Sequence, residues 1–310
     1  MTGQNTEIVL DALRNVPGFQ ELDATATTIE RMGGLTNLVY RVETGGQCVV
    51  VRIPGEGTEA YIDRAVEIHN TKIAADAGIG ARVLWADSKT GVLICDCIEG
   101  IETMTPELFQ SRPRSPARAG AALRQLHNAP EPFEFRFELF SMIDEYLALL
   151  SEKVIDLPEG YHAVVAEAAP IKELLASKPI ALVPSHCDPL CENFLDDGTR
   201  MWIVDYEYSG MNDPFWDLGD LSVEAGLTPA QELEMLTAYC GAVPTAAQVG
   251  RTAIYKAMCD LLWTLWGLIQ HADKNPADDF WAYSINRLER CKSLMNDTAF
   301  AGHLAAVDAG

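Results

Sequence analysis

SHCDPLCENF, residues 185–194, ends a short apolar run and opens a polar one. After it, FLDDGTRMWIV, residues 194–204, has apolar residues on both sides of Asp197-Gly198, a dipeptide typical of tight turns. We therefore predict a β-hairpin here, with IALVP at 180–184 as a buried strand that leads into it. Polar side chains at the base of a hairpin are held in fixed positions, unlike those of an ordinary surface loop.

The base of this hairpin carries His186, Asp188, Asn193 and Asp205. Because a hairpin folds back on itself, Asn193 and Asp205 are expected to lie near one another although twelve residues separate them. Carboxylate and amide oxygens suit Mg²⁺, which binds them together with substrate phosphates. Asp188 is placed to accept a proton from a substrate hydroxyl. The arrangement indicates phosphoryl transfer; the alternative is that Asp and Asn are simply common in loops.

A thiolate metal site is the other interpretation of this segment, through His186, Cys187 and Cys191. The spacing matches no common zinc pattern and a fourth ligand is not evident, so buried structural cysteine is the better interpretation. The eight cysteines of the chain form no CxxC pair. This pattern is typical of reduced thiols in a cytoplasmic protein.

The composition limits the partners. A formal net charge of −22 over 310 residues argues against nucleic acid and anionic membranes, and it would suit a cationic small substrate without establishing one. No apolar run approaches the roughly 18 residues of a membrane span, and no signal peptide is indicated at the N-terminus. We expect a cytoplasmic protein that acts on a small molecule and contacts no membrane. The sequence leaves the oligomeric state open.

Residues 1–98 are predicted to form a five-stranded antiparallel sheet with one helix. The strands are expected at 27–32, 38–43, 48–53, 82–87 and 91–100. The helix covers about 61–77 and ends at Gly78, which occupies a typical position after a helix C-terminus. This first domain is a small β-rich lobe.

Residues 99–310 are predicted to be mainly helical, after a hinge near Cys95–Gly100. Helices are expected at about 115–129, 137–152, 161–176, 229–240, 246–272 and 276–296. A cap residue followed by proline marks the start of three of them, at Ser115-Pro116, Thr228-Pro229 and Asn275-Pro276. The β structure of this domain is confined to 180–206. The whole chain is therefore an α+β protein of two lobes.

The catalytic motif resembles that of a known superfamily. H-x-D-x-x-x-x-N, followed by an aspartate at the end of a hairpin, resembles the catalytic loop and metal aspartate of kinase-like phosphotransferases. The H-x-D form, with IVDYEYSG (203–210) in place of DFG, is similar to the aminoglycoside and choline kinase branch. MGGLTN (32–37), VVVRIPGEGTEAYIDRAVEI (49–68) and NDPFWDLGD (212–220) also resemble choline kinases. The resemblance covers about residues 30–290 and implies a protein-kinase-like fold that uses ATP and Mg²⁺.

The resemblance assigns roles in the catalytic loop by position. Asp188 would be the catalytic base, and Asn193 and Asp205 would bind Mg²⁺. His186 would brace the loop. Asp217, in FWDLGD, would buttress the loop backbone from the following helix.

In the small lobe the resemblance implies a set of nucleotide contacts, namely Gly33, Gly34, Thr36, Asn37, Arg52, Glu67 and Asp96. The glycine turn is a weak signal by itself, because it fits any hairpin. Arg52 stands where a strand lysine is usual, and it keeps the charge and adds a two-pronged geometry for phosphate. Glu67 is expected to pair with Arg52; the alternative is an ordinary surface glutamate.

The resemblance also implies an acceptor site. A quaternary ammonium cannot donate a hydrogen bond, so it requires aromatic faces and a carboxylate. The implied residues are Glu224, Trp263, Trp266 and Tyr283, with Tyr208 and Asp220 as further contributors. Trp263 and Trp266 share a helix face at i, i+3, and core packing is the alternative for them.

Three functions follow, in order of preference. The first is an ATP-dependent choline kinase that makes phosphocholine. The second is a kinase of the same fold for another acceptor: ethanolamine, thiamine, an aminoglycoside or a sugar. The third is a catalytically silent nucleotide-binding protein, against which the intact set of Asp188, Asn193 and Asp205 argues.

Overall fold

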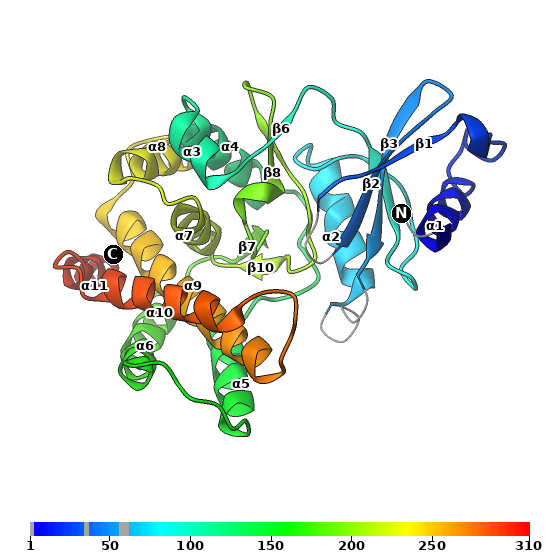
Figure 1. Cartoon of the computed structure of the whole chain (residues 1–310). Helices are drawn as coiled ribbons and strands as arrows, with labels where there is room; N and C mark the ends of the chain where they lie inside the picture. Colours follow the sequence, from blue (N-terminus) through cyan, green and yellow to red (C-terminus); the bar gives the residue numbers. More distant parts are fainter. Residues whose placement is uncertain (1–2, 34–36, 56–61) are drawn as a thin grey trace.

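A small sheet lobe precedes a larger, mostly helical lobe in the computed structural model, which describes residues 3–33, 37–55 and 62–310 (Figure 1). The two-lobed α+β architecture predicted from the sequence is confirmed. The small-lobe sheet ends at Asp96. The domain division between residues 98 and 99 stays a prediction.

The small-lobe sheet has five antiparallel strands in the order β1-β2-β3-β5-β4. They are β1 (Thr28–Arg31), β2 (Asn37–Thr44), β3 (Gln47–Pro54), β4 (Val83–Ala86) and β5 (Leu93–Asp96). The five predicted strands are therefore present. Side chains alternate along β3, so that Val49 and Val51 enter an apolar core while Arg52 lies on the opposite face.

Two helices of this lobe lie against different faces of the sheet (Figure 1). Helix α1 (Gly3–Leu13) contributes Val9 and Leu13 to the core that contains Val49. Helix α2 (Arg64–Asp76) meets the other face, where Glu67 pairs with Arg52. The prediction of a single helix in this lobe was incomplete, because α1 was not anticipated although its apolar residues recur at helical spacing.

The ends of α2 are set by local chemistry. The carboxylate of Asp63 accepts hydrogen bonds from the amides of Ala65 and Val66, which caps the first turn. At the other end Gly78 adopts φ +74°, a conformation that glycine reaches without strain. The predicted end of this helix is confirmed.

The helical lobe is built around α9 (Ala246–Ala272), against which α5, α7, α10 and α11 pack. The other helices are α3 (Pro106–Ser111), α4 (Ser115–His127), α5 (Leu139–Ser151), α6 (Tyr161–Ser177), α7 (Pro214–Glu224), α8 (Pro229–Cys240), α10 (Phe280–Met295) and α11 (Phe300–Ala309). Within the described ranges, no helix is long and apolar enough to cross a membrane.

The helix bounds predicted from the sequence are confirmed at α8 and α9, where Thr228 and Thr245 each form a capping box. Two predicted starts are wrong. Helix α10 begins at Phe280 rather than after Asn275, because the side chain of Asp279 caps its first turn. Ser115 is the first residue of α4 and not its cap. Helices α3 and α11 were not predicted.

The β structure of the large lobe extends beyond the predicted segment. The hairpin is confirmed as β8 (Phe194–Asp196) and β9 (Met201–Ile203), joined through Asp197-Gly198. The short strand β6 (Glu102–Thr103) pairs with β8 and extends the hairpin to three strands, whereas β10 (Gly210–Asn212) pairs with β7 (Val183–Ser185) in a separate two-stranded sheet.

The strand predicted from IALVP is shorter than expected. Ile180 and Ala181 are exposed, and the ladder begins only at Val183. Because β10 is only three residues long, it pairs with no more than that length of chain. The strand nevertheless lies near the middle of the molecule (Figure 1), where it leads into the loop that carries His186 and Asp188.

Candidate active site

The loop that follows β7 is anchored on the first turn of α7. The side chain of Asp213 caps this helix and accepts a hydrogen bond from Phe215 N, which places Asp217 in the first turn. Asp217 Oδ2 accepts from the amide of His186 at 2.7 Å, and Oδ1 accepts from the amide of Cys187 at 2.9 Å. The buried carboxylate thus contacts the loop backbone as the resemblance implies.

His127, which the sequence did not single out, supports Asp217 from α4. Its Nε2 lies 3.0 Å from Asp217 Oδ2, and its Nδ1 lies 2.9 Å from the hydroxyl of Tyr239. Helix α7 can approach α9 because Gly219 has no side chain: a Cβ there would lie 2.9 Å from Thr252 O. These contacts fix the helix on which the loop rests.

His186 ties the loop to the far end of the hairpin. It is fully buried, and its Nε2 lies 2.9 Å from the carbonyl oxygen of Val204. Burial lowers the pKa of His186, so the ring is neutral at pH 7 and donates to that oxygen. Cys187 and Asp205 have φ of +69° and +68°. Such strained conformations cost about 1–3 kcal/mol and persist only where the surroundings impose them.

The hairpin brings the two proposed metal ligands to one place. Val204 N donates to Asn193 O at 3.0 Å, so Asn193 lies beside the residue that precedes Asp205. Asn193 Nδ2 donates to the main-chain oxygen of Asp188 at 3.0 Å. The amide oxygen of Asn193 is therefore the atom of this side chain that a cation would use.

Arg52 connects the small lobe to Asp205. Its Nη1 forms an ion pair with Glu67 Oε1 and lies 3.1 Å from Asp205 Oδ1. Both Arg52 and Glu67 are buried, at 7% and 1% exposure. Glu67 is therefore the partner of Arg52, and the alternative of a surface glutamate is wrong.

Glu207 and Arg64 extend this network and were missed in the sequence. Asn37 Nδ2 lies 3.0 Å from Glu207 Oε2 and 3.4 Å from Asp205 Oδ1. Arg64 Nη1 lies 2.8 Å from Glu67 Oε2 and 3.5 Å from Glu207 Oε2. The available signal was the position of Glu207, two residues after Asp205 in DYEY.

The remaining predicted nucleotide residues are less closely placed. Gly33 is exposed, and Gly34 and Thr36 lie outside the described residues. Asp96 pairs with Arg82, and its register partner Val49 belongs to the face of the sheet opposite Arg52. Nucleotide contacts from these residues stay predictions.

Electrostatics distinguish Asp188 from ordinary carboxylates. The pKa of Asp188 is raised to about 8, first by burial and then by the nearby carboxylates of Asp205 and Glu207, while Arg287 opposes the shift. Burial also raises the pKa of Asp205, which Arg52 counteracts. Carboxylate oxygens of Glu67, Asp205 and Glu207 lie within 4.8 Å of one another. This concentration of oxygen ligands and negative charge fits a hard divalent cation such as Mg²⁺.

The aromatic residues predicted for the acceptor are brought together by α9, α10 and the loop after β9. Ring centroids are 6.2 Å apart for Tyr208 and Trp263, 6.0 Å for Trp263 and Trp266, and 5.8 Å for Trp266 and Tyr283. Phe280, which the sequence did not indicate, lies 5.4 Å from Trp266. Trp263 is 8% exposed, so core packing is part of its role, whereas Trp266 is only partly buried.

Glu224 is held by two arginines of α10. Arg287 binds both of its carboxylate oxygens, with Nη2 at 3.0 Å from Oε2, and Arg290 Nη2 lies 3.2 Å from Oε1. Asp260 belongs to the same group, because its Oδ1 accepts a hydrogen bond from Arg290 Nη2 at 2.6 Å. The guanidinium of Arg287 also lies 4.9 Å from the ring centre of Tyr283. The sequence signal for Arg287 was its i+4 spacing from Tyr283.

Asp220 lies behind this group rather than at its surface. It is 1% exposed, and its Oδ1 accepts from Cys259 Sγ at 3.0 Å. Burial raises its pKa well above the ordinary value, and Glu224 adds to the effect. Within the described chain, Asp220 Oδ2 makes no hydrogen bond.

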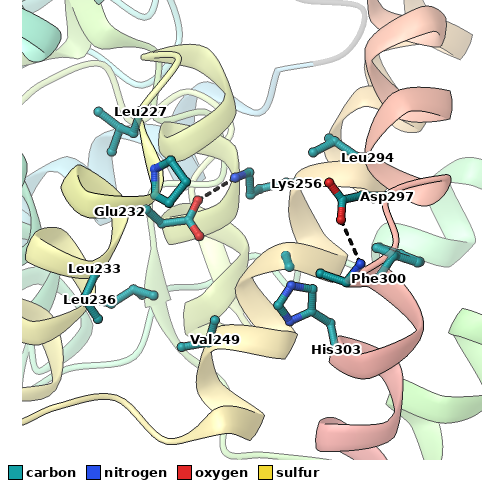
Figure 2. A pocket seen from close by; sticks show the side chains of 13 residues that line it. Leu227, Glu232, Leu233, Leu236, Val249, Lys256, Leu294, Asp297, Phe300 and His303 are labelled. Atoms are coloured by element: carbon teal, nitrogen blue, oxygen red, sulfur yellow. Dashed lines mark hydrogen bonds and ion pairs between the residues drawn. The ribbon is translucent and has the colours of Figure 1, made fainter.

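A cavity of about 500 Å³ lies elsewhere, among α8, α9 and α11 (Figure 2). Apolar side chains such as Leu236, Val249 and Phe300 line it, together with the ion pair of Glu232 and Lys256. None of the residues predicted for the site lines this cavity, so it is not part of the candidate active site.

Known proteins share both the sequence pattern and the fold. The model of the phosphotransferase enzyme family matches residues 27–249. A crystal structure of a choline/ethanolamine kinase family protein from Mesorhizobium loti is 52% identical, with a TM-score of 0.90, over 98% of this chain and 99% of that chain. The resemblance and the kinase-like fold inferred from the sequence are thereby confirmed.

Two curated relatives are more distant. LicA of Haemophilus influenzae is 26% identical over 285 residues, 90% of this chain and 83% of that protein. Ethanolamine kinase 2 of Mus musculus is 27% identical, over 83% of this chain and 73% of that protein. The Mesorhizobium loti protein is described by both choline and ethanolamine, and the mouse protein by ethanolamine alone, so the likeness does not distinguish the two acceptors.

Proposed function

Because this chain belongs to the phosphotransferase enzyme family and is a small-molecule kinase of the choline/ethanolamine type, we propose that it transfers the terminal phosphoryl group of ATP to the hydroxyl of choline. The observation that carries the proposal is the convergence of Asp188, Asn193 and Asp205 between the lobes, within electrostatic reach of the acceptor group. The charges of both Glu224 and Arg287 act on Asp188.

The nucleotide side follows from the network around Arg52. Asn193 and Asp205 would hold Mg²⁺, which supplies neutralisation of the phosphate charge when bound. Arg52 presents its guanidinium on the same side as Asp205 and is kept there by Glu67. Its planar fork suits phosphate oxygens, which favours binding and alignment of the transferred group.

Asp188 is the proposed general base. With a pKa raised to about 8, it is close to the operating pH, where a base is most effective. It accepts the proton of the acceptor hydroxyl as that oxygen forms its bond to the terminal phosphorus and the bond to ADP breaks. The loop that carries Asp188 is held by Asp217 and His186, which keeps the carboxylate in place.

The acceptor side favours choline over ethanolamine. Aromatic faces attract a quaternary ammonium by about 0.5–2 kcal/mol per well-placed ring, with no hydrogen bond required. The ammonium of ethanolamine has N–H groups that need acceptors, and leaving them unpaired is costly. Both oxygens of Glu224 already accept from Arg287, so this carboxylate is a poor additional acceptor.

Ethanolamine is the second candidate, because an ethanolamine kinase is among the relatives and because Asp220 Oδ2 is an unused acceptor close to Glu224 within the described structure. A rearrangement of the site that exposed the carboxyl group of Asp220 would provide a hydrogen-bond acceptor for the primary ammonium of ethanolamine. Thiamine, aminoglycosides and sugars are larger than choline and require a wider acceptor site. They are included among the acceptors to test.

A panel of acceptors tests the proposal. ATP consumption would be coupled to a reporter reaction with choline, ethanolamine, thiamine, an aminoglycoside and a sugar, and the product identified by phosphorus NMR. We expect kcat/KM for choline to exceed that for ethanolamine by about tenfold, equivalent to about 1.4 kcal/mol. A preference for ethanolamine would contradict the choline assignment, and no consumption with any acceptor would favour a silent nucleotide-binding protein.

A further inference from the structure

Cys48 and Cys97 lie at the same edge of the small-lobe sheet. Strands β3 and β5 pair with Val49 opposite Asp96, and one further step of this register puts Cys48 opposite Cys97. Opposed residues of antiparallel strands have Cα atoms about 4.5–5.5 Å apart, within the range of about 4.4–6.8 Å that a disulfide spans. The two thiols are near enough to influence one another electrostatically, and both are free.

The pair is reachable from solvent. Each cysteine keeps part of its surface exposed, and a hollow of about 360 Å³ opens beside Cys48. The hollow is lined by the turn between β2 and β3 and by Glu99, in the connection that follows β5. The start of β3 and this connection therefore lie side by side, and a small thiol compound can approach them.

A cationic side chain lies beside the two sulfurs. The guanidinium of Arg41 lies near Cys97, and its charge also acts on Cys48. Glu43, which pairs with Arg41, and Glu99 supply the opposing charge on the same surface. The pKa of Cys48 is raised to about 12, first by burial. A raised pKa disfavours the reactive thiolate, so Cys48 is the poorer first nucleophile and Cys97 is the thiol that we expect to react first.

We propose that Cys48 and Cys97 form a modification site whose reactant is a low-molecular-weight disulfide. The thiolate of Cys97 attacks one sulfur of the reactant, which forms a mixed disulfide and releases one thiolate. The thiolate of Cys48 then attacks the Cys97 sulfur, which forms the Cys48–Cys97 bond and releases the second thiolate. The two cysteines lose two electrons and two protons, and the reactant leaves as two thiols.

The cross-link acts on the nucleotide side of the site, a consequence that rests on the proposed function. Cys48 lies on the same face of β3 as Arg52, because side chains alternate along a strand. Cys97 is the first residue after β5, where the chain leaves the small-lobe sheet. A covalent tie between these residues alters the surface that faces ATP. We expect the KM for ATP to rise about fivefold, equivalent to about 1 kcal/mol, with the KM for choline unchanged.

Treatment of the protein with oxidised glutathione tests the site. After alkylation under denaturing conditions, peptide mapping should identify a Cys48–Cys97 cross-link that dithiothreitol removes. Cys48→Ser should stop at a glutathione adduct on Cys97, whereas Cys97→Ser should form neither product. Cys240→Ser, a partly exposed cysteine on α8, is the matched control and should behave as the unmodified chain. Melting scans verify that each variant is folded.

The peptide map and the kinetic measurements test different parts of the proposal. A map without the cross-link would overturn the proposed site even if the reduced enzyme phosphorylates choline normally. A mapped cross-link with an unchanged KM for ATP would overturn its connection to the nucleotide. If the reduced enzyme consumes no ATP with any acceptor, the proposed function fails, and the mapped cross-link alone still decides whether the site exists.

Discussion

The two halves of the candidate site are charged differently. On the nucleotide side, four carboxylates share the space with two guanidiniums of the described chain: Asp188, Asp205, Glu207 and Glu67 with Arg52 and Arg64. On the acceptor side, the carboxylates of Glu224 and Asp260 form ion pairs with the guanidiniums of Arg287 and Arg290, and a third carboxyl group, Asp220, is buried beside Glu224 with a raised pKa. One half has an excess of negative charge, and the other is balanced.

This difference shows how each half is completed. Burial and then the neighbouring carboxylates raise the pKa of Asp188, so a cation bound on the nucleotide side would relieve the repulsion among these carboxylates. The acceptor side is already neutralised and is built on packed helices, so it is formed before any ligand arrives. The nucleotide half also spans both lobes, through Arg52 and Asp205, whereas α7, α9 and α10 of one lobe supply most of the acceptor half.

Asp188→Asn should give the largest effect. Loss of the base lowers kcat by about 10²–10⁴-fold, because positioned general bases contribute that much. ATP binding should be retained, since the base acts on the acceptor hydroxyl. Rate assays and calorimetry with Mg·ATP measure the two effects, and full activity in this variant would remove Asp188 from the role.

Asp205→Ala should damage the nucleotide half in another way. A proposed metal ligand is lost, so Mg²⁺-dependent ATP affinity should fall at least about tenfold, together with activity. Calorimetric titration of ATP at several Mg²⁺ concentrations provides the measurement. Asp197→Ala, in the hairpin turn, is a control outside the cation site. Unchanged Mg²⁺ dependence in Asp205→Ala would contradict the assignment.

Trp266→Ala tests the acceptor side of the site. Removal of one aromatic face should raise the KM for choline by about tenfold and leave the KM for ATP nearly unchanged. Trp263→Ala is a less clean test, because truncation of a buried tryptophan costs about 3–5 kcal/mol. Trp281→Ala on α10, which contacts His271 outside the acceptor group, is the matched control. Lower melting with an unchanged choline KM would assign these rings to packing.

Arg52→Lys should have a smaller effect. Lysine keeps the charge between Glu67 and Asp205 but loses the planar fork, so the KM for ATP should rise by about threefold to tenfold without inactivity. Arg136→Lys, at an exposed ion pair with Glu138, controls for the exchange itself. Kinetics indistinguishable from the original chain would mean that Arg52 does not face the phosphates.

The smallest expected effect is on stability. In the folded state the pKa of Asp188 is raised to about 8, from about 3.9 in the unfolded chain. The stabilising contribution of this carboxyl group is therefore complete below about pH 4 and is lost as the pH rises to about 8. The melting temperature of ligand-free Asp188→Asn should therefore exceed that of the original chain by a margin that grows from pH 5 to pH 8.

Asp197→Asn provides the opposite case for this measurement. Hydrogen bonds from the amides and hydroxyl of the turn, together with Arg200, lower the pKa of Asp197, so its contribution is complete above about pH 4. Its variant should melt lower by a margin that stays constant from pH 5 to pH 8. A constant margin for Asp188→Asn as well would contradict the raised pKa.

The sequence by itself determined the features that depend on neighbours along the chain. Asp197-Gly198 specified the hairpin, Thr228-Pro229 specified the start of α8, and alternation specified the five strands. Asp188 and Asn193 were identified from the same local pattern, because they lie in the loop that leads into this hairpin. A hairpin that folds back at a known turn fixes where its base must be, so the proximity of Asn193 and Asp205 follows from the local pattern alone.

The tertiary structure alone decided the contacts between distant segments. Arg287 holds Glu224 across 63 residues, and Glu207 reaches Arg64 across 143. Packing of α7, α9 and α10, and of one lobe against the other, selects these partners from many exposed charges. Local signals carry no information about such packing, because the energy that chooses a partner comes from burial and shape rather than from spacing along the chain.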